Sequence, residues 1–211
     1  QRRGWGLPSR AGDNLFWVGR YVERAGGALR LVRALINRAA EADETAAPIV
    51  ARISALLSVW SAGPNDIPHA RAVLIARGAL TRRDCDGALP HLAAAARSAA
   101  AVIRDRFSPD GWRALTHLVT TIDAALPPGP PESVMLERAD AALRIIASFS
   151  GLAQENMSRL AGWRFLELGR RIERAIATCR FVRQFAETPA QDGALDVLLE
   201  LADSQITYRQ R

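Results

Sequence analysis

The stretch FWVGRYVERA, residues 16–25, recurs 150 residues further on as LELGRRIERA, residues 166–175, without gaps. The glycine, two of the arginines, the glutamate and the alanine are identical, and most apolar positions match in kind. Apolar residues three and four positions apart form one face of a helix. The two stretches therefore predict one long amphipathic helix that occurs twice in the chain.

The matching glycines, Gly19 and Gly169, predict how the two helices meet. A glycine inside a helix costs about 1 kcal/mol relative to alanine. Two of them at equivalent positions indicate close approach of another backbone. We therefore expect the two helices to pack together with approximate twofold symmetry. The residues expected to face inward are Val18, Val22 and Ala25 on the first helix, and Leu168, Ile172 and Ala175 on the second.

Each stretch also carries a charged cluster at the edge of its apolar face. Positions i, i+3 and i+4 are neighbours on a helix surface. The candidate site residues are Arg20, Glu23, Arg24, Arg170, Glu173 and Arg174. One interpretation is a buried salt-bridge network that fixes helix register, in which Arg20, Glu23, Arg170 and Glu173 are hydrogen-bonded to one another across the two helices. The other is an anion-binding or catalytic site, for which no catalytic residue is assigned.

Outward from these stretches, apolar periodicity and helix breakers predict helices through the whole chain. The expected ranges are about residues 10–43, 48–62, 68–77, 88–106, 109–126, 132–155, 162–187 and 192–208. We expect an all-α, single-domain bundle of about eight helices, with the repeated long helix in a pseudo-twofold arrangement. The domain should cover residues 9–211, and residues 1–8 are typical of a linker remnant, which suggests a domain of a longer protein.

Several helix ends have their own signals. Ser9, Ser108 and Asp192 are predicted N-caps, because serine and aspartate oxygens accept hydrogen bonds from the free N–H groups of a first turn. Pro109 follows Ser108 at a position where a first turn tolerates proline. The polar segment Gly78–Gly87 is predicted to be a loop.

The composition limits the chemistry. All 28 basic residues are arginine, so lysine Schiff bases and P-loop lysines are excluded. The net charge of +6 and the pI of about 10.7 favour acidic partners, which include acidic proteins and nucleic acid. The charge is spread over several helices, so a nucleic-acid-binding module remains only a third hypothesis.

Cysteine and histidine do not suggest a metal or cofactor. Cys85 and Cys179 form no C-x-x-C pair, and His69, His91 and His117 are dispersed. We therefore expect no metal, no cofactor and no disulfide, as is usual in the reducing cytoplasm. No apolar run reaches the ~18 residues that span a bilayer, so we expect no membrane partner.

Residues 8–25 and 163–175 resemble the alpha-E family, which is named for its helical character and its Glu-Arg motif. Weaker matches are Ile103–Arg106 with Trp112, Glu155–Met157, and the ending Tyr208–Arg211. Together they cover nearly the whole chain. One departure is His117, because the family often has asparagine there.

The resemblance implies an association with circularly permuted ATP-grasp ligases, either fused or separate. It implies a role in making or modifying a peptide through amide bonds. The first hypothesis is therefore an accessory domain that holds a partner or an anionic peptide substrate, without catalytic activity of its own. The alternatives are an enzyme that uses Glu23 and Glu173, and an arginine-rich nucleic-acid binder.

Overall fold

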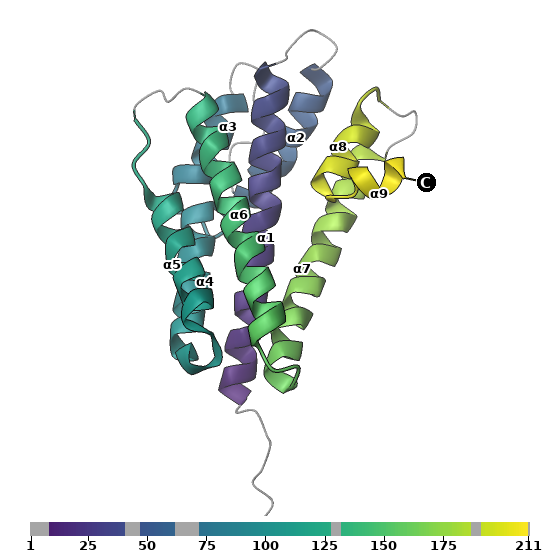
Figure 1. Cartoon of the computed structure of the whole chain (residues 1–211). Helices are drawn as coiled ribbons and strands as arrows, with labels where there is room; N and C mark the ends of the chain where they lie inside the picture. Colours follow the sequence, from purple (N-terminus) through teal and green to yellow (C-terminus); the bar gives the residue numbers. More distant parts are fainter. Residues whose placement is uncertain (1–8, 41–46, 62–71, 128–131, 187–190, 211) are drawn as a thin grey trace, which may run out of the picture.

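A computed structural model describes residues 9–40, 47–61, 72–127, 132–186 and 191–210. Within these ranges the chain forms nine α-helices and no strand (Figure 1), which confirms the all-α prediction. The helices are α1 Ser9–Ala40, α2 Ala47–Ser61, α3 Ala72–Thr81, α4 Leu89–Val102, α5 Pro109–Asp123, α6 Glu132–Asn156, α7 Ala161–Phe185, α8 Ala194–Leu201 and α9 Gln205–Arg209. A 3-10 turn, Arg104–Arg106, follows α4.

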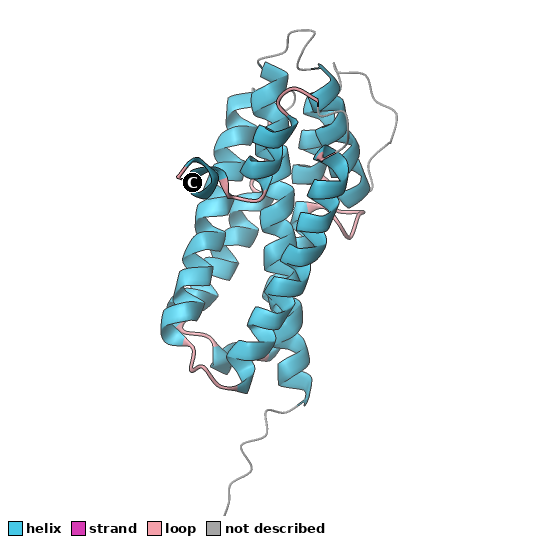
Figure 2. Ribbon diagram, turned by 90° about the vertical axis from the view of Figure 1, so that its right-hand side faces the viewer, coloured by secondary structure: helices cyan, strands magenta, loops and turns pink. Residues whose placement is uncertain are grey.

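Helix α1 is the centre of the bundle. It packs against α2, α3, α4, α6, α7 and α8, and its four glycines and its aliphatic side chains are buried on almost every side. Helices α1 and α7 run in the same direction and separate towards the end where α8 lies (Figure 1). Figure 2 shows that the bundle is long and narrow and that α9 lies across the long helices.

Two groups of buried apolar side chains make the core. One lies around the C-terminal half of α1, with α2, α3 and α8, and contains Leu29, Leu57 and Trp60. The other lies around the N-terminal half of α1, with α4, α5 and α6, and contains Leu15 and Phe149. Helices α4, α5, α6 and α7 contribute to both groups as well as α1, so these helices join the two groups into one bundle.

The observed start of a helix matches the predicted one where the sequence has a clear N-cap signal. The Ser108 hydroxyl accepts a hydrogen bond from the Gly111 backbone N–H at 3.1 Å, which confirms the predicted N-cap of α5. Ser9 is the first residue of α1 instead of its cap. The end of the first predicted helix, residues 41–43, lies outside the described residues.

Two segments differ from the prediction. Helix α3 continues to Thr81, so Gly78 is helical and the predicted loop begins four residues too early. Asp192 does not cap the last helix: Gly193, with φ of 77°, takes the N-cap position of α8. The predicted final helix is also broken in two at Asp203, whose φ is 53°.

The prediction of which face of α7 points inward is also wrong. Leu168, Ile172 and Ala175 are exposed instead of buried. The buried positions are Leu166, Glu167, Gly169, Glu173, Ala177, Phe181 and Phe185. Both faces of α7 carry apolar side chains at helical spacing, so periodicity alone did not decide between them. No helix in the described ranges is long and apolar enough to cross a membrane.

Candidate functional site

The two backbones of α1 and α7 touch at the predicted glycines. A Cβ added to Gly19 would overlap the carbonyl oxygen of Leu166, and one added to Gly169 would overlap that of Phe16. The two contacts are reciprocal, because residues 16 and 166 are equivalent in the two motifs. Only glycine allows this approach, so the prediction that Gly19 and Gly169 meet is confirmed.

Glu173 is held by the two arginines of the first motif. Its carboxylate accepts hydrogen bonds from Arg20 Nε at 2.5 Å, from Arg24 Nε at 2.7 Å and from Arg24 Nη2 at 3.1 Å. The Glu173 side chain is only 1% exposed. Both of its oxygens are therefore bonded to protein groups inside the bundle.

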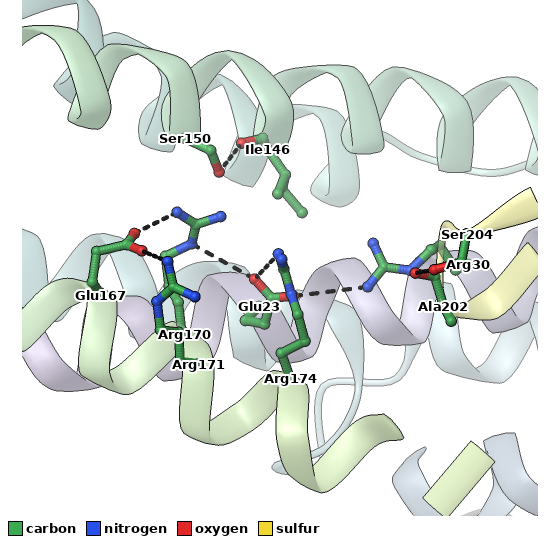
Figure 3. Close-up of polar contacts among 10 residues, drawn as sticks. All are labelled: Glu23, Arg30, Ile146, Ser150, Glu167, Arg170, Arg171, Arg174, Ala202 and Ser204. Atoms are coloured by element: carbon green, nitrogen blue, oxygen red, sulfur yellow. Dashed lines mark hydrogen bonds and ion pairs between the residues drawn. The ribbon is translucent and has the colours of Figure 1, made fainter. Parts of the chain in front are cut away.

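Glu23 occupies the reciprocal position and is surrounded by more arginines (Figure 3). Its carboxylate accepts hydrogen bonds from Arg174 Nε at 2.8 Å and Nη2 at 3.1 Å. Arg170 Nε lies 3.6 Å and Arg30 Nη2 lies 3.9 Å from its oxygens. Three guanidinium groups therefore share one carboxylate.

Burial follows a gradient from the glutamates to the outer arginines. Glu23 and Glu173 are buried, Arg20 and Arg170 are mostly shielded, and the Arg174 side chain is 61% exposed. The carboxylates thus fit the structural interpretation. Arg170 departs from it, since it forms its hydrogen bond with Glu167 and has only a longer ion pair with Glu23.

The surroundings of the two helices are not equivalent. Helix α1 is enclosed by six other helices, whereas α7 packs mainly against α1 and α8. The reciprocal contacts therefore describe the α1–α7 pair, and an internal repeat of the domain stays a prediction.

Sequence reasoning missed two members of this cluster, Glu167 and Arg30. Glu167 is buried, accepts a hydrogen bond from Arg170 at 2.6 Å and lies 3.5 Å from Arg171. It aligns with Trp17 in the first motif, so comparison of the two motifs hid it. Its position three residues before Arg170 was the available signal. The equivalent Arg20 instead lies 5.7 Å from the Trp17 ring centroid.

Burial and the neighbouring charges shift the pKa values of Glu173 and Arg30. Burial raises the pKa of Glu173, but hydrogen bonds from Arg24 and Arg20 outweigh it, so the pKa is lowered overall. Burial lowers the pKa of Arg30; Glu23 opposes this effect, and the positive charge of Arg174 adds to it. Burial is thus the largest cause of the lowered pKa of Arg30, and the Asp203 carboxylate opposes it together with Glu23.

A cleft of about 380 Å³ opens beside Glu23, between α1, α6 and α7. Its charged lining consists of Glu23, Arg30, Arg33, Arg170, Arg174 and Asp203. A second cleft, of about 470 Å³, shares Arg30, Arg174 and Asp203 and extends towards α8. Two of the four arginines already pair with carboxylates outside the lining, Arg33 with Asp140 and Arg170 with Glu167. Arg30 and Arg174, which share Glu23, make the first cleft a candidate anion site. Ser150 lies on its α6 side (Figure 3).

A wider and more open hollow of about 800 Å³ lies between α5 and α6 and includes His117. Its charged residues, Asp110 and Arg113, already form an ion pair with each other at 2.5 Å. Among the described residues, no three side chains of histidine, cysteine, aspartate or glutamate are grouped to hold a metal ion. The cleft beside Glu23 is therefore the stronger candidate site.

Comparison with known proteins gives a family match and several relatives. The sequence model of the alpha-E family, described as "a predicted alpha-helical domain with a conserved ER motif", matches residues 7–211. Relatives described as uncharacterized proteins of Mycobacterium bovis and Mycobacterium tuberculosis are 27% identical over 237 residues, with 98% of this chain covered. The chain spans 26% of the length of these relatives. No solved structure matches the chain. With the family model matched over nearly its whole length, the chain belongs to the alpha-E family of helical domains.

Proposed function

We propose that this chain is an accessory domain that binds an anionic peptide for an amide-bond-forming system. Its partner in this proposal is a circularly permuted ATP-grasp protein, fused or separate, which supplies the ATP-dependent chemistry. The cleft beside Glu23 holds a carboxylate of the peptide. Because such a partner consumes ATP, the proposal places the system in the cytoplasm.

The observation that carries the proposal is the surplus of arginine around Glu23. Arg30, Arg170 and Arg174 all contact this one carboxylate, and of these only Arg170 is also hydrogen-bonded to Glu167. Arg33, which pairs with Asp140, lines the same cleft. Guanidinium groups bind carboxylates through paired, charge-assisted hydrogen bonds. An entering carboxylate therefore meets donors whose charge Glu23 only partly balances.

The state of Glu173 favours a binding role over the alternative of an enzyme using Glu23 and Glu173. A general base works best when its pKa lies near the working pH and one oxygen can reach the substrate. The pKa of Glu173 is lowered, and both of its oxygens accept hydrogen bonds from Arg20 and Arg24. Such a carboxylate is a poor proton acceptor at neutral pH.

Calorimetric titration tests the cleft. We expect triglutamate to bind and triglutamine, which has the same length without side-chain charge, to bind at least tenfold more weakly. Arg30→Gln should weaken triglutamate binding by a similar factor, since Arg30 lines both clefts. Arg33→Gln serves as a second variant, because its side chain is more exposed and its replacement disturbs the core less.

Arg164→Gln is the matched control, because Arg164 is exposed on α7 and lies outside both clefts. Equal binding of the two peptides, or unchanged binding by both cleft variants, would refute the anion site. The partner is tested separately, by adding the domain to a purified circularly permuted ATP-grasp protein. We expect faster peptide-dependent ADP release at low peptide concentration, and no such gain with Arg30→Gln.

A further inference from the structure

The outer face of α7 carries a continuous apolar stripe. Its members follow each other at alternating spacings of three and four residues: Phe165, Leu168, Ile172, Ala175, Cys179 and Val182. All six are exposed, including Leu168 at 48% and Val182 at 45%. This stripe lies opposite the buried face that packs on α1. A helix that is apolar on two opposite faces is typical of an element with a second packing partner.

The spacing of the stripe indicates what kind of partner it suits. Alternating steps of three and four residues are the heptad pattern with which one helix packs along another. At its N-terminal end the stripe opens into a groove of about 400 Å³, lined in part by Leu160, Phe165 and Leu168. The surface therefore offers a long apolar seam that starts at a depression.

The charges beside the stripe are all positive. Arg164, Arg171 and Arg183 are exposed on α7. The two glutamates of the helix, Glu167 and Glu173, are buried and already paired with arginines. Positions beside a helix–helix seam select partners by charge, so this surface selects for carboxylates.

A second copy of this chain is a poor match for the stripe. Two α7 helices packed through it, in either direction, would bring arginines of one copy beside arginines of the other. Like charges beside a seam disfavour pairing. An acidic helix instead gains apolar contact along the seam and ion pairs on its flanks.

We propose that the outer face of α7 docks an amphipathic helix whose apolar stripe is flanked by aspartate or glutamate and which belongs to another protein domain. The relatives extend well beyond the region matched by this chain, so further domains accompany the alpha-E region there. This docking surface is separate from the cleft beside Glu23, and the inference does not depend on the peptide-binding proposal.

The probe is a three-heptad helical peptide with leucine at positions a and d and glutamate at e and g. Its glutamates repel one another, which limits pairing of the peptide with itself. We expect it to bind the chain, and the same peptide with lysine at e and g to bind at least tenfold more weakly. The double variant Leu168→Ser/Ile172→Ser should abolish binding of the glutamate peptide. Leu74→Ser, at an exposed apolar position on α3, should leave it unchanged.

Two further measurements separate the possible occupants. The Cys179 thiol is exposed within the stripe, so the glutamate peptide should slow its alkylation, whereas Cys85 is buried and should react slowly throughout. Sedimentation of the chain alone should give a monomer. A dimer that Leu168→Ser/Ile172→Ser dissociates would replace the proposal with self-association. Equal binding of both peptides, or binding of neither, would overturn it.

Discussion

At the scale of single residues, the site depends on how two buried carboxylates are neutralised. Glu173 accepts all its hydrogen bonds from Arg20 and Arg24, whereas Glu23 is shared among three arginines. Charge is thus balanced at Glu173 more closely than at Glu23. This difference is why Glu173 is assigned to stability and the cleft beside Glu23 to binding.

Glu173→Gln should lower the free energy of unfolding by about 3 kcal/mol, because removing one partner of a buried ion pair leaves the other charge uncompensated. Arg20, which is only 17% exposed, would be the main residue left without its partner. Glu137→Gln, an exposed change on α6, is the control and should change stability by less than about 0.5 kcal/mol. Urea unfolding at pH 7 gives both values; equal values would refute the structural role of Glu173.

The lowered pKa of Glu173 also predicts a dependence of stability on pH. A carboxylate with a lower pKa in the folded state contributes stability above its unfolded pKa, which is about 4.3 for glutamate. That contribution is lost as the pH falls through the folded pKa. Urea midpoints measured between pH 7 and pH 3 should therefore fall less steeply for Glu173→Gln than for the unaltered chain. Parallel curves would contradict this assignment.

At the scale of helices, the crossing of α1 and α7 depends on their glycines. Gly19→Ala should destabilise the chain by about 1–3 kcal/mol, the usual cost of overpacking, because the new methyl group meets the Leu166 carbonyl. Gly151→Ala on α6 is the control, since apart from the adjoining residues and backbone of α6 nothing lies within 4 Å of its added Cβ. It should stabilise by about 0.5–1 kcal/mol through helix propensity alone. Thermal melts of the two variants should shift in opposite directions, and shifts of the same sign would contradict the close crossing.

The cap of α5 gives a second prediction for a single helix. Ser108→Ala removes the side-chain acceptor for the Gly111 N–H and should cost about 1 kcal/mol. Ser108→Asp keeps an acceptor and should retain most of the stability. Urea unfolding of the two variants measures the difference, and a negligible loss in Ser108→Ala would show that the cap contributes little.

The helices show which features the sequence could predict. Gly19 and Gly169 were informative because an interior glycine is costly unless a backbone approaches it. The orientation of α7 was not predictable, because Leu168 and Ile172 fit helical periodicity as well as the buried Leu166 and Phe181 do. Arg30 was also missed, since it lies outside the repeated stretch, seven residues after Glu23 on the same helix.

At the scale of the whole molecule, α1 connects the two groups of core side chains, so the bundle should unfold as one unit. Trp60 lies in one group and Trp112 packs against the other. In a variant without Trp112 and in one without Trp60, fluorescence and circular dichroism should give the same urea midpoint within each variant, as a two-state transition requires. Fluorescence and circular dichroism midpoints that differ within one variant would show two domains within residues 9–211.

Because α1 and α7 approach most closely at one pair of glycines, a small tilt of α7 at this crossing produces a larger displacement at its far end. From Gly169 to Gln184 the helix extends about 22 Å at 1.5 Å per residue, so a tilt of about 5° at the crossing moves its far end by about 2 Å. At that end the side chains of Arg52 and Gln184 each donate a hydrogen bond to the other residue's backbone carbonyl, both at 3.1 Å. A displacement of 2 Å breaks bonds of that length. A change in the distance between α1 and α7 at their crossing would therefore break the hydrogen bonds that attach the far end of α7 to α2.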